Sequence, residues 1–419
     1  MPDLLTTAQR TDLLAERYRS VRRATEILAT PLSPEDQTVQ SMPDVSPTKW
    51  HRAHTSWFFE TFLLESQLAG YRSFHPQFAY LFNSYYEGVG ARYPRARRGV
   101  VSRPGVLEVA RYRAHVDAAM ARLFDRGPAP AAADLIELGL HHEQQHQELL
   151  LMDIKHVLSC SPLEPAYATV TVATPSPQSP GRWIEHDGGP VETGHDGRGF
   201  AFDNEGPRHT VHLEPFALAG RPVTCGEWVA FIDDGGYERP DLWLSDGWAT
   251  AQAENWTSPL YWSRVVDDWW LFTLGGPQLV DPAEPVCHVS YYEADAFARW
   301  CGARLPTEAE WETVASPRPG APVDGRFLDT SVLHPRPTVG DALFGDVWQW
   351  TQSAYSPYPG FRPAAGAVGE YNGKFMVNQY VLRGGSCVTP PDHVRATYRN
   401  FFPPSARWAF SGLRLARDS

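Results

Sequence analysis

The chain has 419 residues, which is enough for two or three domains that each bury a core. Its 37 Lys and Arg against 49 Asp and Glu give a formal net charge of -12, which argues against a broad binding surface for nucleic acid or for an anionic membrane. The 42% of hydrophobic and 21% of charged residues are typical of a globular protein. The 15 Trp, 37 Pro and 33 Gly predict a loop-rich domain whose aromatic side chains fill the interior.

The five cysteines are widely spaced and form no C-x-x-C pair, so neither a disulfide framework nor a thiolate zinc site is expected. The first 20 residues lack the basic start and apolar core of a signal peptide, and no apolar run is long enough to span a bilayer. We therefore expect a cytoplasmic protein with reduced thiols and no membrane contact.

The first 160 residues predict helices separated by proline-marked loops. Apolar side chains with helical spacing are Leu14, Tyr18, Val21 and Leu28, then Val109, Tyr112, Val116, Met120 and Leu123. Ser46 and Pro47 predict an N-cap and a first helical residue, and a fourth long helix is expected from about 134 to 158. Four such helices predict a bundle.

A Pro- and Ser-rich stretch separates this half from the rest of the chain. We therefore predict a helical domain over 1–160, a linker over 161–181 and a second domain over 182–419. The second domain has short alternating segments, such as 209–213, many Gly and Pro turns, and brief helical patterns, as near 291–301. No repeat of solenoid length is present.

The segment 139–148 is the most informative for chemistry. His142 and His146 are four residues apart, so on a helix their rings point the same way and can bind one metal ion. Gln145 lies on the same face, whereas Glu148 is about 200° around the helix from His146 and suits a supporting or packing role. The alternative is a solvated polar face with incidental histidines, but leucines flank the segment on both sides.

A third ligand must come from another helix. His54 is the best candidate because it lies on an aromatic stripe, where an imidazole without a partner would be costly. His51, nearly opposite on that helix, is the competitor. Three neutral imidazoles would leave positions open for a thiolate and for dioxygen, which suits ferrous iron or zinc.

These motifs resemble a known two-domain family. Residues 50–54 (Trp-His-Arg-Ala-His) and 142–148 resemble the DinB-like bundle of ergothioneine-biosynthesis sulfoxide synthases. The second half resembles the formylglycine-generating-enzyme fold, a variant of the C-type lectin fold. Its matching segments are 222–228, 305–311, 344–350, 382–386 and 412–414. Together they cover nearly the whole chain and imply an α+β protein, a four-helix bundle followed by a formylglycine-generating-enzyme-like domain.

The resemblance also implies an activity. Iron(II) bound by His54, His142 and His146 would use O2 to join the sulfur of cysteine to C2 of the imidazole of hercynine (Nα-trimethylhistidine), leaving the sulfur as a sulfoxide. A proton or hydrogen donor is needed, since simple oxidation of the thiol to sulfinate competes. Tyr85 and Tyr86, in a FNSYYE-type segment, are the candidates, with Tyr86 preferred.

Substrate-binding residues are expected in both halves. By resemblance, Asn400 would hold the hercynine carboxylate, with Gln145 reaching it directly or through water, and Phe401 would attract the quaternary ammonium by a cation–π contact. Relatives that use γ-glutamylcysteine carry an acidic residue where this chain has Phe402, so free cysteine is expected instead. Arg103 is the candidate for the cysteine carboxylate, whereas the arginines at 92, 95, 97 and 98 are expected to form a solvated basic loop.

Three alternatives stay open. The same ligand set serves enzymes that join cysteine to C5 of histidine, as in ovothiol biosynthesis. We expect no additional methyltransferase domain in these 419 residues, which disfavours this alternative without excluding it. Three histidines also suit a zinc-dependent thiol transferase of the DinB-like fold. A non-catalytic ligand-binding protein is the third. Formylglycine synthesis is disfavoured because Cys387 has no closely spaced partner cysteine.

Overall fold

The computed structural model describes residues 6–170, 181–316, 323–338 and 340–419. Contacts divide the chain into two compact units. The first consists of Met1–Tyr167 together with Ala365–Tyr371, and the second of Ala168–Ala364 with Asn372–Ser419. A short segment from the second half of the sequence therefore belongs to the first unit.

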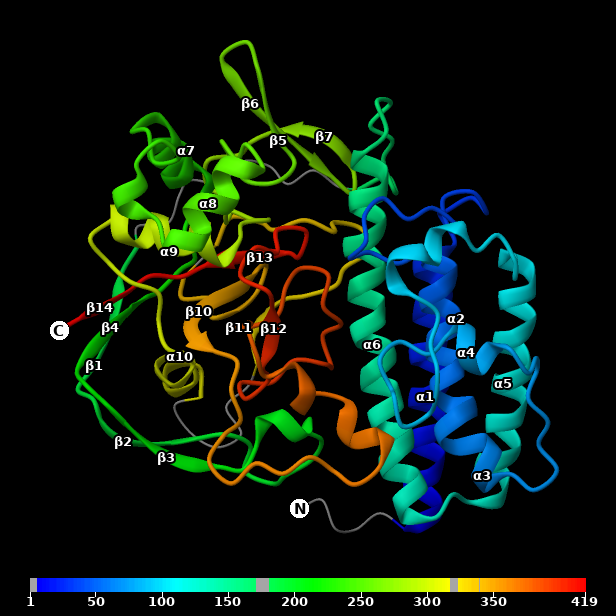
Figure 1. Cartoon of the computed structure of the whole chain (residues 1–419). Helices are drawn as coiled ribbons and strands as arrows, with labels where there is room; N and C mark the ends of the chain where they lie inside the picture. Colours follow the sequence, from blue (N-terminus) through cyan, green and yellow to red (C-terminus); the bar gives the residue numbers. More distant parts are fainter. Residues whose placement is uncertain (1–5, 171–180, 317–322, 339) are drawn as a thin grey trace. The chain divides into compact units, whose positions relative to one another are not determined.

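Long helices build the first unit, as expected for a bundle (Figure 1). They are α1 (Thr7–Ala29), α2 (Thr48–Phe59), α5 (Val106–Arg126) and α6 (Pro130–Ser159). Shorter elements are the π-helical turn η1 (Glu60–Leu64), α3 (Glu65–Gln67), α4 (Phe78–Leu81) and the 3-10 helix η2 (Arg95–Val100). Helix α6 packs against both α1 and α2, and α2 packs against α5. The predicted helical bundle is confirmed.

Local sequence explains where these helices begin. The Thr6 side chain accepts a hydrogen bond from the backbone of Gln9, forming a capping box that starts α1. Pro130 is the first residue of α6, where its missing N–H costs nothing, so this helix begins four residues earlier than predicted. The predicted cap of α2 is wrong by one residue. Pro47 occupies the cap position, and the backbone N–H of Ser46 instead donates to Asp153.

The second unit combines short sheets with short helices (Figure 1). Its strands are β1 (Trp183–His186), β2 (Gly189–Thr193), β3 (His209–Leu213), β4 (Phe216–Ala219), β5 (Trp262–Val265), β6 (Asp268–Thr273), β7 (Gly276–Leu279), β8 (Gly325–Arg326), β9 (Phe344–Gly345), β10 (Trp348–Ala354), β11 (Tyr380–Arg383), β12 (Asn400–Phe402), β13 (Ser411–Leu413) and β14 (Ala416–Asp418). Its α-helices are α7 (Cys225–Asp233), α8 (Ser245–Ala253), α9 (Tyr291–Trp300) and α10 (Glu308–Ala315), and its 3-10 turns are η3 (Asp203–Glu205), η4 (Pro240–Leu242) and η6 (Gly373–Phe375). The turn η5 (Ala367–Glu370) belongs to the first unit. The predicted strand over 209–213 and the helix near 291–301 are confirmed.

One sheet of the second unit has the strand order β12-β11-β10-β13, which puts β12 at an edge. Leu382 pairs with Asn400, and Tyr380 pairs with Phe402. Large aromatic residues fill the interior, as predicted: Trp228, Trp311, Trp348 and Trp350 are fully buried. The five cysteines form no disulfide with one another.

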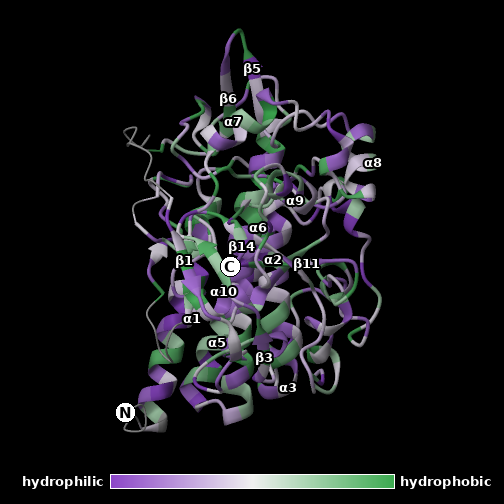
Figure 2. Cartoon of the chain, turned by 90° about the vertical axis from the view of Figure 1, so that its left-hand side faces the viewer, coloured by the Kyte–Doolittle hydropathy of each residue, from purple (hydrophilic) through white to green (hydrophobic). Residues whose placement is uncertain are grey.

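Helices α1 and α5 combine polar and apolar residues along their length. Figure 2 shows polar and apolar residues alternating on α1. The buried residues of α5 include the predicted apolar positions, such as Val109, Val116 and Leu123. Among the described residues, none of the helices combines the length and the apolar character needed to cross a membrane.

Candidate metal centre

Three histidines meet where α2 and α6 pack. His54 lies on α2, and His142 and His146 lie one turn apart on α6. One ring nitrogen of each lies within 4.8 Å of the other two. The close approach of the helices depends on Gly139, one turn before His142, because a Cβ there would lie 2.6 Å from a ring carbon of Phe59. The structure thus brings together the three histidines that the sequence singled out.

The hydrogen bonds of His54 fix which of its nitrogens faces the other two rings. Its Nδ1 lies 2.6 Å from the carbonyl oxygen of Phe82, so Nδ1 carries the proton and donates it. Its Nε2 is therefore a bare acceptor, 3.1 Å from Nε2 of His142. Two imidazole nitrogens so close to each other suit a shared cation, since each can then present a lone pair.

Burial keeps the three imidazoles neutral. It lowers the pKa of His54 and of His146 well below the ordinary value, and it lowers the pKa of His142 to about 3. Neutral imidazole is the form that binds metals. The Nδ1 atom of His142 is buried and has no hydrogen-bond partner among the described residues. The donor set and its protonation therefore fit a divalent metal ion.

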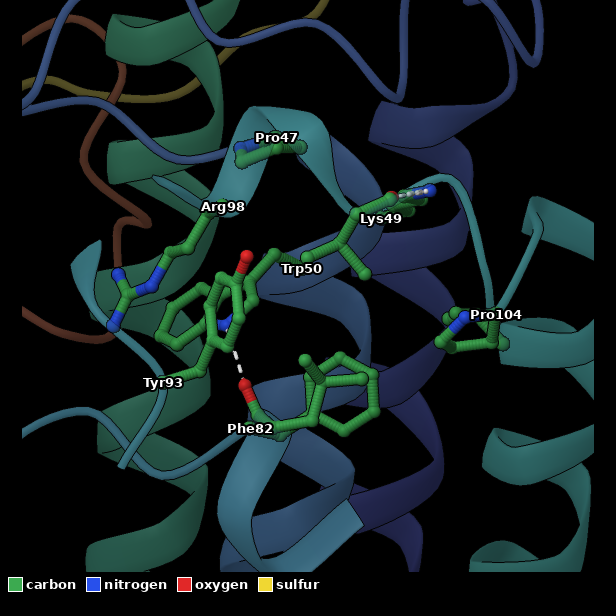
Figure 3. A pocket seen from close by; sticks show the side chains of 10 residues that line it. Pro47, Lys49, Trp50, Phe82, Tyr93, Arg98 and Pro104 are labelled. Atoms are coloured by element: carbon green, nitrogen blue, oxygen red, sulfur yellow. Dashed lines mark hydrogen bonds between the residues drawn. The ribbon is translucent and has the colours of Figure 1, made fainter. Parts of the chain in front are cut away.

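A column of stacked rings holds His54 in place. The imidazole lies between the indoles of Trp50, at 4.5 Å and 14°, and Trp57, at 5.3 Å and 16°. The guanidinium of Arg98 lies 3.4 Å from the ring centroid of Trp50 (Figure 3). Arg98 is buried and donates a hydrogen bond to Ser46 Oγ. The prediction that Arg98 belongs to a solvated loop is therefore wrong. The indole of Trp50 and the hydroxyl of Ser46 compensate for the burial of its charge.

A buried ion-pair cluster surrounds Glu143, the residue that follows His142 on α6. Glu143 accepts hydrogen bonds from Arg22 of α1, Arg113 of α5 and the hydroxyl of Thr25. Burial disfavours the charged carboxylate, but the two guanidinium groups outweigh it and lower the pKa of Glu143 to about 2. The cluster fixes α6 to α1 and α5 beside the histidines. The sequence offered no signal for it, since its members are about 30 to 120 residues apart.

His51, the competing third ligand, does not join the three nitrogens. Its Nδ1 lies 2.8 Å from Nδ1 of His146, and its Nε2 lies 3.0 Å from the carboxylate of Asp153. Both ring nitrogens are therefore engaged behind the site. Asp153, two turns beyond His146 on α6, is a site residue that the sequence analysis missed.

The two candidate tyrosines lie in the loop after α4. Tyr86 is fully buried against Trp57 and Phe62, with ring centroids 5.6 and 5.1 Å apart. The ring of Tyr85 stacks on it at 4.5 Å, and the two hydroxyls are 3.5 Å apart. Burial raises the pKa of Tyr86, so its hydroxyl keeps its proton at neutral pH. The Asn83 side chain shapes the loop by bonding both the N–H and the carbonyl of Tyr86.

A third tyrosine comes from the distant segment 365–371. The hydroxyl of Tyr371 donates to Oε1 of Gln145, and its ring lies 5.8 Å from that of His142 and 6.5 Å from that of Tyr85. The neighbouring Glu370 carboxylate accepts the backbone N–H groups of residues 87 and 88, at 3.0 and 2.7 Å. No local pattern marks these residues, because they reach the site across more than 200 positions of sequence.

The remaining candidates lie elsewhere in the chain. Asn400, Phe401 and Phe402 form β12 in the second unit, where Phe401 stacks on Tyr355 at 4.0 Å. The side-chain oxygen of Asn400 accepts the N–H of Phe401. Arg103 is exposed in the loop before α5. Their expected contacts with substrate stay predictions.

Comparisons with known proteins agree with this architecture. A family model described as "Sulfatase-modifying factor enzyme 1-like domain" matches residues 169–330 and 341–419. A hercynine oxygenase of Mycolicibacterium thermoresistibile is 32% identical, over 90% of this chain and 88% of its own length. The hercynine oxygenase of Mycobacterium tuberculosis is also 32% identical, over 90% and 92%. A formylglycine-generating enzyme of Streptomyces coelicolor is 29% identical over 53% of this chain and 84% of its own.

The solved structure of PvdO from Pseudomonas aeruginosa matches 57% of this chain and 94% of its own, with a TM-score of 0.39 and 20% identity.

A helical bundle that gathers three neutral histidines, followed by a domain of the sulfatase-modifying-factor class, defines a two-domain enzyme of the oxygenase type. Within that class, the chain belongs to the hercynine oxygenase family of ergothioneine biosynthesis, as a sulfoxide synthase fused to a formylglycine-generating-enzyme-like domain.

Proposed function

We propose that this protein is an iron(II)- and O2-dependent sulfoxide synthase that joins the sulfur of cysteine to C2 of the hercynine imidazole. The observation that carries the proposal is the gathering of three neutral imidazole nitrogens within 4.8 Å in a member of this family. The reaction balances with one O2. One oxygen atom ends in the sulfoxide, and the other leaves as water with the hydrogens of the thiol and of C2.

Iron is the proposed metal because the reaction is an oxidation. Iron(II) supplies the redox chemistry that activates dioxygen, which zinc lacks. His54, His142 and His146 would hold the ion, and three protein ligands leave positions for both substrates. The Trp50 and Trp57 rings on either side of His54 exclude water from this edge of the site.

Tyr85 and Tyr86 are the residues proposed to determine whether sulfoxide or sulfinate is formed. Tyr86 holds its hydroxyl proton at neutral pH, and Tyr85 lies close enough to exchange protons with it. We assign to this pair the donor that favours C–S bond formation over oxidation of the thiol to sulfinate.

Substrate recognition is assigned from the resemblance and from side-chain chemistry. Asn400 and Gln145 would bind the hercynine carboxylate, and Phe401 offers an aromatic face to its quaternary ammonium. Arg103, which is exposed, would pair with the cysteine carboxylate. Phe402 has no charge for a glutamyl ammonium, so cysteine is the proposed donor over γ-glutamylcysteine. Five cysteines without a disulfide suit a cytoplasmic setting.

The test is to load the purified chain anaerobically with iron(II), add hercynine and cysteine, admit O2, and record product mass and oxygen uptake. The proposal expects a mass equal to hercynine plus cysteine plus oxygen minus two hydrogens. Activity with zinc and no oxygen uptake would instead identify a thiol transferase. A C5 adduct formed from histidine in preference to hercynine would identify an ovothiol-type enzyme.

A further inference from the structure

A hydrogen-bonded row of side chains lies behind His146. Asp153 Oδ2 accepts the backbone N–H of Ser46 at 2.7 Å and lies 3.0 Å from Nε2 of His51. The other ring nitrogen of His51, Nδ1, lies 2.8 Å from Nδ1 of His146. His51 and Asp153 are each only 2% exposed, so water does not compete for these contacts.

The direction of each hydrogen bond follows from the carboxylate at the end of the row. A carboxylate only accepts, so His51 carries its proton on Nε2 and donates it to Asp153. The Nδ1 atom of His51 then has a lone pair, which accepts a hydrogen bond from Nδ1 of His146. His146 is left with its lone pair on Nε2.

We propose that His51 and Asp153 are positioning residues for the metal ligand His146. They fix its tautomer and ring plane, and they increase the electron density on its Nε2, because the negative charge of Asp153 is transmitted through two polarised hydrogen bonds. The inference rests on the proposed metal centre, but it does not depend on which substrates are used.

The three proposed ligands differ in the hydrogen-bond partner of their second ring nitrogen. His54 donates to an uncharged backbone carbonyl, that of Phe82, and Nδ1 of His142 has no hydrogen-bond partner among the residues that the structure describes. Only His146, within the described part of the chain, connects to a carboxylate. We therefore expect His146 to be the ligand whose metal bond depends most on residues behind it.

The experiment measures metal binding alone, by titrating the full chain with cobalt(II) under anaerobic conditions and recording affinity and the visible absorption of the bound ion. Asp153→Asn keeps the size of the side chain and removes its charge. We expect cobalt(II) affinity to fall by roughly 10- to 100-fold and the absorption bands to shift. His51→Asn keeps an acceptor for His146 but breaks the link to Asp153, so it should lower affinity by a similar factor.

Two further variants separate positioning from folding. Tyr18→Phe removes a partly buried hydrogen bond to Asp117 elsewhere in the bundle and should leave cobalt(II) affinity unchanged. The double variant of His51 and Asp153 should bind no more weakly than either single variant, since both interrupt one chain of bonds. If Asp153→Asn does not fold, His51→Asn decides the question by the same readouts.

Wild-type affinity and an unchanged spectrum in folded Asp153→Asn or His51→Asn would overturn the proposal and leave both residues a purely structural role. Failure of the metal centre itself has a different signature. In that case His146→Ala would bind cobalt(II) as the wild type does.

Discussion

Each imidazole of the triad has a different neighbour at its second nitrogen. His54 has a backbone carbonyl, His146 has the His51 ring, and Nδ1 of His142 has no partner among the described residues. Hydrogen bonds at this nitrogen decide the tautomer and the donor strength of a histidine ligand. The three metal bonds are therefore expected to differ in strength, although the residue type is the same.

The tyrosine pair is the residue-scale test of product control. Replacing both Tyr85 and Tyr86 by Phe keeps the stacked rings and removes the two hydroxyls. The variant should still consume oxygen but make more cysteine sulfinate relative to sulfoxide, because the proton donor is lost. The ratio is measured by mass spectrometry. Tyr80→Phe, at a tyrosine that is 40% exposed, is the matched control, and an unchanged ratio in the double variant would remove the pair from the mechanism.

Phe402 is the residue-scale test of thiol choice. Its ring is half-buried on β12 and lies 5.7 Å from that of Trp408. Phe402→Asp should favour γ-glutamylcysteine by roughly ten-fold or more in relative kcat/KM, since a charge-assisted hydrogen bond contributes about 1.5–3 kcal/mol. Phe402→Leu changes size without adding charge. A wild type that already prefers γ-glutamylcysteine would contradict the assignment.

At the scale of elements, α6 supplies most of the site, and its packing depends on Gly139. A methyl group there would lie 2.6 Å from a ring carbon of Phe59 and 2.9 Å from one of Phe58. Gly139→Ala should therefore lower the free energy of unfolding by about 1–3 kcal/mol, even though alanine favours a helix by about 1 kcal/mol. Urea denaturation measures the change. Gly105→Ala, which meets nothing within 4 Å, should change stability little.

In the second unit, Glu308 at the start of α10 connects to the segments around β11 and β12. Arg399 donates to both of its oxygens, and Arg383 donates to one at 2.9 Å. Glu308→Gln should reduce the free energy of unfolding by about 3 kcal/mol, because it removes the carboxylate that pairs with the buried guanidinium of Arg399, whereas Arg383 keeps its ion pair with Glu312. Glu254→Gln, at an exposed carboxylate after α8, is the control and should have almost no effect.

The same carboxylate predicts a pH dependence. Burial alone would raise the pKa of Glu308, but Arg399 and Arg383 outweigh it and hold that pKa below its ordinary value. Its stabilisation is therefore complete above the pKa of an unfolded glutamate, about 4.3, and is lost as the pH falls through the lowered value. Urea midpoints recorded from roughly pH 6 to 3 should fall more steeply for the wild type than for Glu308→Gln. Parallel curves would contradict this origin.

At the scale of the whole molecule, the fold and the triad were predictable, and most of the residues behind the triad were not. Helical periodicity identified the bundle, and the four-residue spacing of His142 and His146 pointed to the two histidines that α6 brings together with His54. Asp153 and Tyr371 carry no such pattern, because their roles come from tertiary contacts. Ser46 shows the reverse case, in which a clear local pattern gave a wrong prediction. Its sequence context predicts an N-cap, but its hydrogen bonds go to Asp153 and Arg98 instead.

Metal binding should stabilise only the unit that holds the triad. An ion at a hundred times its dissociation constant adds about 2.7 kcal/mol to the free energy of unfolding. Iron(II) or cobalt(II) should therefore raise the Tm of the transition in which the bundle unfolds, and a chelator should reverse the shift. Calorimetry checks this, with His142→Ala as the control. A metal-induced rise in Tm that persists in His142→Ala would place the ion elsewhere.

The segment Ala365–Tyr371 makes the two halves of the sequence depend on each other in evolution. It lies in the second half of the sequence, yet it bonds Gln145 and the tyrosine loop in the first half. A chimaera made by joining halves of two relatives at the predicted linker would therefore carry a foreign segment inside its helical bundle. Recombination between relatives is expected to succeed only when that short stretch is exchanged together with the helices it touches.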